Sequence, residues 1–124
     1  MEITRSGDRS AVYGGRFTGR VELEMLAPAA TSDAPDLARV HFFDGAVTSW
    51  HVHPGGQQLV LLGGTGRAGV DELGEEIAPG THVAFPAGER HWHGAAEGRD
   101  CVWLAVTWGV TDWEEGAPTL GAGH

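Results

Sequence analysis

The stretch that decides the fold runs from Gly45 to Gly64 and reads GAVTSWHVHPGGQQLVLLGG. His51 and His53 stand one residue apart, so on an extended segment their imidazoles point to the same side. A proline and two glycines then turn the chain and lead to Gln57, whose side-chain oxygen can also bind a metal. The apolar run that follows is typical of a buried strand. This stretch therefore predicts a β-sheet protein with a polar cluster inside it.

A second cluster, His91-Trp92-His93, follows Pro86-Ala87-Gly88. We interpret residues from both clusters as ligands of one metal ion inside a small β-barrel. These ligands are His51, His53, Gln57 and His91. Three neutral imidazoles and an amide oxygen leave the charge of a divalent ion uncompensated, which makes it a stronger Lewis acid than a glutamate ligand would. Mixed nitrogen and oxygen ligation suits manganese, iron, nickel or zinc, and the ligands alone do not choose among them.

Composition and charge exclude several classes of protein. A chain of 124 residues suits one domain, and its 20 glycines and 6 prolines are typical of many tight turns between short strands. The formal net charge of −9 and the lack of lysine argue against nucleic acid or an anionic membrane as partner. The single cysteine, Cys101, cannot form an internal disulfide, and the N-terminus lacks the apolar part of a signal peptide. We expect a cytoplasmic protein.

Short apolar segments separated by turn residues predict an all-β fold. Expected strands cover residues 20–26, 38–43, 57–62, 81–85 and 101–108, with a hairpin over 67–76. Residues 112–115 are expected to form one short turn of helix. Strands at this spacing indicate an antiparallel barrel or jelly roll.

We expect the whole chain, residues 1–124, to form a single domain. Its core should span about residues 17–110. An N-terminal arm should precede the core at residues 1–16. An acidic, glycine-rich tail should follow at about 114–124 and should be flexible.

The two histidine clusters resemble the paired motifs of the cupin superfamily. The residues that match the first motif are Gly45, His51, His53 and Gly64, and those that match the second are Gly80, Pro86, Gly88 and His91. Gln57 replaces the usual glutamate of the first motif, and Ala95 replaces the usual asparagine of the second. The resemblance implies the cupin fold, a double-stranded β-helix that closes into a jelly-roll barrel.

A closer resemblance covers most of the chain. The segments WHVHP at 50–54 and HWHGAA at 91–96 look like those of small bacterial cupins that act as manganese-dependent hydroxynitrile lyases, relatives of carboxymuconolactone-decarboxylase-like cupins. The resemblance implies manganese as the bound ion and Gln57 as its fourth ligand. The pocket residues of those lyases correspond to Ala38, Val40, Thr48, His93 and Thr107. One position departs from the family, because Trp103 stands where the lyases carry a pocket histidine.

His93 and Trp103 each have two interpretations. His93 shares the strand face of His91, so it is either a general base in the same cavity, helped by Thr48, or a histidine at the rim of the site. Trp103 is either an apolar wall of the substrate pocket or a residue of the core.

Three functions therefore stay open. The first is a metal-dependent lyase acting on a small carbonyl or hydroxyl compound, with cyanohydrin cleavage or synthesis as its specific form. The second is a cupin dioxygenase, isomerase or cyclase acting on an aromatic or polyketide-like compound. The third is a ligand-binding cupin without turnover. The partner in each case is a small molecule, and we expect a homodimer or homotetramer because an exposed sheet edge favours pairing.

Overall fold

The computed structural model describes residues 1–12, 16–114 and 116–118, and within these ranges the chain forms eleven strands and no helix. The strands are β1 (Arg9–Ala11), β2 (Val21–Ala27), β3 (Asp36–Phe42), β4 (His51–Val52), β5 (Gln57–Gly64), β6 (Gly66–Gly69), β7 (Glu75–Ile77), β8 (His82–Phe85), β9 (Trp92–Ala95), β10 (Cys101–Thr107) and β11 (Asp112–Trp113). No helix in the described ranges could therefore cross a membrane.

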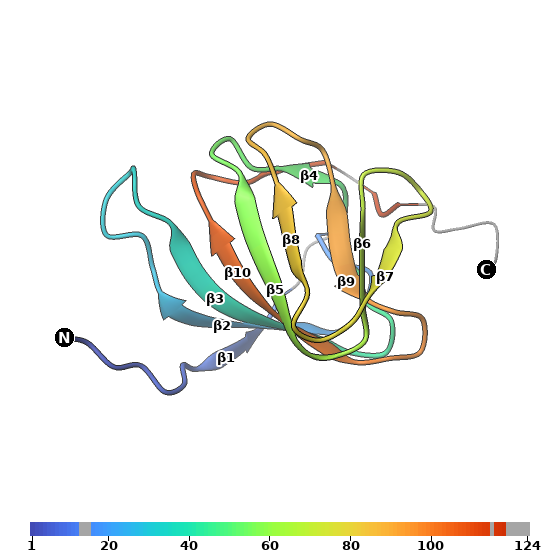
Figure 1. Cartoon of the computed structure of the whole chain (residues 1–124), viewed down its shortest axis with the longest axis horizontal. Helices are drawn as coiled ribbons and strands as arrows, with labels where there is room; N and C mark the ends of the chain where they lie inside the picture. The colour runs from blue at the N-terminus through green and yellow to red at the C-terminus, as the bar shows by residue number, and fades with distance from the viewer. Residues whose placement is uncertain (13–15, 115, 119–124) are drawn as a thin grey trace.

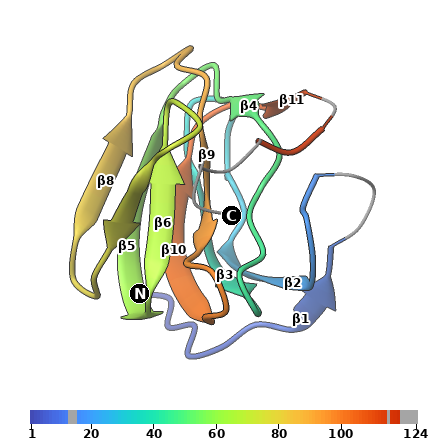
Figure 2. The ribbon, with the colours of Figure 1, turned by 90° about the vertical axis from the view of Figure 1, so that its right-hand side faces the viewer.

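The strands form two facing layers (Figures 1 and 2). The larger layer is an antiparallel sheet in the order β1-β2-β3-β10-β5-β8. The other layer contains the sheet β7-β6-β9 and the pair β11-β4, and a bridge between His51 and His91 connects these two parts. The predicted all-β jelly roll is confirmed.

In the central strands, side chains that point into the barrel alternate with side chains that point outward, and the inward ones form the core. Successive residues of a strand point to opposite faces, so β3 and β10 each send every second side chain inward. Val40 lies opposite Trp103, and Ala38 lies opposite Ala105, so the inward side chains of the two strands lie in matching rows. Burial of each large apolar side chain in such rows stabilises the fold by about 1.5–3 kcal/mol.

One tight turn brings the predicted ligands together. Gly56 has a φ of 88°, in the left-handed region that glycine adopts without strain. Its N–H donates to the carbonyl of His53 at 3.0 Å. The turn ends directly before Gln57, the first residue of β5, so it carries the chain from His53 to Gln57 within four residues.

The structure confirms the hairpin over 67–76, which β6 and β7 form. The expectation of a helical turn at 112–115 is wrong, because Asp112 and Trp113 form β11 and pair with Val52 and His51. The expected N-terminal arm contains β1, which pairs with β2. Both β1 and β11 thus lie outside the expected core limits yet belong to the sheets. Most of the expected flexible tail, residues 115 and 119–124, lies outside the described residues.

Candidate metal centre

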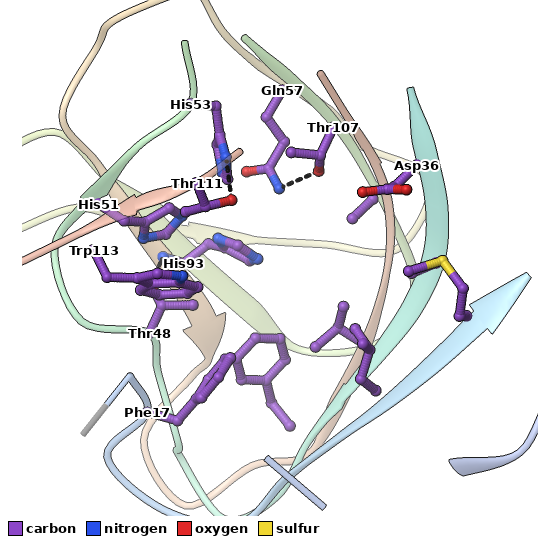
Figure 3. Close-up of a pocket in the computed structure, with 16 residues that line it drawn as sticks. Phe17, Asp36, Thr48, His51, His53, Gln57, His93, Thr107, Thr111 and Trp113 are labelled. Carbon is purple, nitrogen blue, oxygen red and sulfur yellow. Dashed lines mark hydrogen bonds between the residues drawn. The ribbon is translucent and has the colours of Figure 1, made fainter. Parts of the chain in front are cut away.

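The four predicted ligands come together at one end of the barrel. His51 lies in β4, His53 follows it, Gln57 begins β5, and His91 comes directly before β9. The ring centroids of His51 and His91 are 4.3 Å apart, those of His51 and His53 are 4.8 Å apart, and those of His53 and His91 are 5.1 Å apart. All four side chains are buried. Figure 3 shows His51, His53 and Gln57 reaching from the wall of the cavity toward a common space.

In each predicted histidine ligand, Nδ1 has a hydrogen bond to a group outside the ligand set. Nδ1 of His51 lies 2.8 Å from the carbonyl of Ser49, and Nδ1 of His91 lies 2.9 Å from the carbonyl of Glu89. Because a carbonyl only accepts, each Nδ1 carries the proton and each Nε2 keeps its lone pair. Nδ1 of His53 lies 3.0 Å from the hydroxyl of Thr111 (Figure 3). Metal-binding histidines are commonly oriented in this way.

The amide of Gln57 is oriented as well. Its Nε2 donates to the hydroxyl of Thr107 at 2.9 Å, which turns Oε1 toward the histidines (Figure 3). Oε1 lies 3.1 Å from Nε2 of His91. Since His91 carries its proton on Nδ1, two lone-pair atoms face each other across this distance. Donor atoms roughly 2.0–2.2 Å from one ion and at right angles stand about 3 Å apart, so a shared cation fits here.

An unpartnered nitrogen gives a second test of fit. Nε2 of His53 is buried and has no hydrogen-bond partner among the described residues. A buried polar atom without a partner costs roughly 1–3 kcal/mol, and coordination to an ion would remove that cost. The donor set, three imidazoles and one amide oxygen, is also suited to a divalent transition metal. The residues present therefore fit a metal ion.

Burial keeps these histidines neutral. Desolvation, then the neighbouring His91, lowers the pKa of His51 to about 3. Desolvation also lowers the pKa of His53 to about 4 and that of His91 to about 4. Neutral imidazole is the form that binds metals, so the ligands are ready to coordinate at neutral pH without first losing a proton.

His93 lies beside the predicted ligands. One ring nitrogen each of His51, His91 and His93 lies within 4.8 Å of the others, so His93 is also close enough to share an ion with two of the predicted ligands. Nδ1 of His93 is buried and has no hydrogen-bond partner among the described residues. The N–H of its main chain donates to the hydroxyl of Thr48 at 3.1 Å. Desolvation, then the three neighbouring histidines, lowers the pKa of His93 well below its usual value.

An apolar cavity of about 190 Å³ opens beside this cluster. The predicted pocket residues Ala38, Val40, Thr48, His93 and Thr107 all line it, together with His51, His53 and Gln57. His91 lies behind this surface, fully buried, with the ring of Phe85 stacked on it at 3.7 Å.

Trp103 does not lie where the prediction of a pocket wall places it. The side chain is fully buried in the core, and its indole N–H donates to the carbonyl of Gly94 at 2.9 Å. A side chain at Gly66 would meet the indole at 2.8 Å, so the absence of one there makes room for the ring. Trp103 thus packs between the sheets and supports His93 edge-on, with the ring centroids 5.7 Å apart.

Sequence reasoning missed the segment that covers the site. Trp113 of β11 lines the cavity. Its ring centroid lies 4.5 Å from that of His51 and 5.5 Å from that of Phe17. Thr111, two residues earlier, contacts His53. The available clue was a tryptophan two residues after a threonine in an otherwise polar segment, a spacing that puts both on one strand face.

The fold and the cavity together define a jelly-roll barrel with a histidine-lined site. The sequence profile of the cupin domain family matches residues 38–107. The chain belongs to this family.

Comparison with known proteins gives closer relatives. The chain is 41% identical over 109 residues to an (R)-mandelonitrile lyase of Granulicella tundricola, a match that covers 86% of this chain and 83% of the relative. A cupin-like protein of Thermotoga maritima has a similar structure, with a TM-score of 0.79, 29% identity, and coverage of 93% of this chain and 90% of the other. An acetylacetone dioxygenase of Acinetobacter johnsonii shares the fold, with a TM-score of 0.74, 14% identity, and coverage of 98% and 83%.

Proposed function

We propose that this cupin is a metal-dependent lyase that cleaves and forms cyanohydrins, the adducts of hydrogen cyanide with an aldehyde. The observation that carries the proposal is an apolar cavity that ends on oriented histidines beside a neutral histidine, His93, with an unpartnered ring nitrogen. The relative named as a mandelonitrile lyase supports this choice of reaction. Manganese is the metal that the family resemblance favours.

The residues proposed to hold the ion are His51, His53, Gln57 and His91. Hydrogen bonds to neighbouring groups orient each of these side chains, whereas Nδ1 of His93 has no partner among the described residues, which supports this set over one containing His93. When bound, a divalent ion would supply Lewis acidity to the oxygen of the substrate. Because none of the four ligands is charged, that acidity would not be reduced by the protein.

The cavity fits an aromatic substrate. An apolar cavity of ~150 Å³ in another protein holds benzene, so about 190 Å³ accommodates one ring with a small polar substituent. Leu23, Met25, Val40 and Phe42 line the apolar part, while Thr48 and His93 border its polar end. A ring would lie against the apolar side chains, and the carbon bearing the hydroxyl and the nitrile would lie near the histidines.

The side chains at the polar end suit proton transfer. Neutral His93 would accept the proton of the cyanohydrin hydroxyl while the bond to the nitrile carbon breaks and the carbonyl forms. The departing cyanide would then take that proton and leave as hydrogen cyanide, which returns His93 to its neutral form. The negative charge of the cyanide would stabilise the imidazolium in this desolvated place. Thr48, which accepts from the main chain of His93, keeps its own hydroxyl proton to donate to the substrate.

A purified, manganese-loaded protein tests the proposal. We expect benzaldehyde and cyanide to appear from mandelonitrile, followed by ultraviolet absorbance and a cyanide assay, and we expect the metal-stripped protein to lack this activity. An oxygen electrode in the same reaction separates the main alternative, since a dioxygenase acting on an aromatic compound consumes oxygen and a lyase does not. Oxygen uptake with catechol-like substrates and no cleavage of cyanohydrins would favour that alternative. Saturable binding of these compounds with no product would favour a binding protein.

A further inference from the structure

One predicted ligand is held differently from the others. The carbonyls of Ser49 and Glu89, each two residues before its histidine, hold Nδ1 of His51 and of His91. Nδ1 of His53 instead meets the hydroxyl of Thr111, a side chain 58 residues away in the sequence. The orientation of His53 therefore depends on one side-chain atom that a substitution can remove without touching the main chain.

A hydroxyl also differs from a carbonyl in chemistry. A carbonyl can only accept, whereas a threonine hydroxyl can accept or donate. When Thr111 accepts from Nδ1–H of His53, the lone pair of Nε2 faces the interior of the site. When Thr111 donates to Nδ1, Nε2 carries the proton and cannot bind a metal. Binding of an ion thus selects the state in which the Thr111 oxygen accepts.

The main chain on both sides of Thr111 is fixed to the segment that carries His53. Before it, the N–H of Gly55 donates to the carbonyl of Trp108 at 3.2 Å, and the N–H of Trp108 donates to the carbonyl of Gly56 at 3.1 Å. After it, β11 pairs with β4. The main chain that carries the hydroxyl is therefore held beside His53, so little backbone conformational entropy is lost when Thr111 orients the imidazole.

We propose that Thr111 is a positioning residue of the metal centre: it directs Nε2 of His53 to the ion from the segment between β10 and β11. This inference rests on the ligand set of the proposed function and is independent of the reaction catalysed. Outer partners of metal ligands contribute about 10–100-fold to affinity, which sets the size of the expected effect.

The test compares manganese affinity in the whole protein, stripped with a chelator and titrated with Mn²⁺ while electron paramagnetic resonance follows the free ion. We expect Thr111→Val, which keeps the shape and removes the hydroxyl, to weaken binding by about 10–100-fold. Thr111→Ser, which keeps the hydroxyl, should restore affinity to within a few-fold. Val110→Ala changes an exposed neighbour in the same segment and should have no effect.

The melting temperature of the metal-free variants separates positioning from folding, because the inference requires Thr111→Val and Thr111→Ser to melt alike without metal and to differ in Mn²⁺ affinity. Unchanged affinity in Thr111→Val, together with lost affinity in His53→Ala, would overturn the inference and leave the metal centre intact. If affinity also survived in His53→Ala, the ligand set itself would be wrong, and the role of Thr111 with it.

Discussion

His93 differs from its three neighbouring histidines in how its ring is held. The other rings each have a hydrogen-bond partner on Nδ1, whereas that atom of His93 has none among the described residues. Phe42 and Trp103 instead contact the ring edge-on. Because Nδ1 of His93 is not occupied by a partner among the described residues, it is available to a proton of a bound molecule that comes within hydrogen-bond reach.

This difference predicts distinct effects of removing His93. The variant His93→Ala should keep its manganese, because the four proposed ligands remain, and should lose about 10²–10⁴-fold in turnover of a cyanohydrin. Elemental analysis and a steady-state assay on the same sample measure both quantities. Unchanged turnover would show that His93 has only a structural part, and loss of the metal would place it among the ligands.

Removal of His53 should instead reduce metal binding first, and activity should fall as a consequence. The variant His53→Ala loses a direct ligand, so its metal affinity should fall by more than the ~10–100-fold expected for an outer partner. Any activity should fall with the metal content. His82→Ala is the matched control, since His82 is exposed in β8 and pairs with Gln58 on the outer surface. Stoichiometric manganese in His53→Ala after purification would contradict the assignment.

At the scale of the elements, β9 approaches the segment 46–47 closely because Gly94 has no side chain. A Cβ at this position would stand 2.4 Å from the carbonyl oxygen of Ala46 and 2.5 Å from Cα of Val47. Main-chain atoms cannot move aside as the end of a flexible side chain can. The contact sets the distance between the strand that carries His93 and the segment that leads to His51.

We therefore expect Gly94→Ala to destabilise the protein by at least ~1–3 kcal/mol, the usual cost of overpacking. Gly63→Ala provides the control, because a Cβ there meets nothing within 4 Å and a strand favours alanine over glycine. Urea unfolding of both variants measures the difference. Equal midpoints for the two substitutions would show that β9 has more freedom than this packing allows.

A buried carboxylate joins β2, β3 and the N-terminal residues. Glu24 accepts from Arg39 at 2.9 Å, from the N–H of Gly7 at 2.9 Å and lies 3.0 Å from Nε2 of His41. Arg39, then Gly7, then His41 hold the pKa of Glu24 well below its usual value. A depressed pKa in the folded state means that ionised Glu24 stabilises the protein above the ordinary carboxyl pKa, and that this contribution is lost as the pH falls toward the depressed value.

The predicted consequence is a pH-dependent difference between the wild type and Glu24→Gln. The wild type should be more stable at pH 7, and the difference should narrow as the pH falls below about 4.3, the usual pKa of glutamate. Unfolding followed at several pH values measures this. Glu72→Gln, at an exposed position in the β6–β7 turn, should show no such trend. A difference that stayed constant with pH would mean that the charge of Glu24 does not matter for stability.

At the scale of the whole molecule, much of the fold was predictable because the pattern of apolar and polar residues within a strand is visible in a short stretch of sequence. The alternation around Val40 and the apolar run after Gln57 each mark a strand without knowledge of its partner. The spacing of the two histidine clusters likewise identified residues that the barrel brings together. Each of these features is contained in a short stretch of sequence.

Features that depend on distant partners were not predictable in this way. β11 has only two residues, and it forms because Trp113 packs on His51 and Phe17, which no local period reveals. Trp103 has the inward phase of its strand, but the space over Gly66 decides that its indole lies in the core and not at the cavity. The homodimer or homotetramer expected from the exposed sheet edges stays a prediction that native mass measurement would test.

The most direct test of the metal centre is an anomalous difference map from crystals of the manganese-loaded protein. We predict one strong peak per chain, bounded by Nε2 of His51, His53 and His91 and by Oε1 of Gln57, with His93 near the peak but not bonded to it. A peak bonded to His93 in place of His53, or no peak among these residues at full occupancy of Mn²⁺ in solution, would contradict this ligand set.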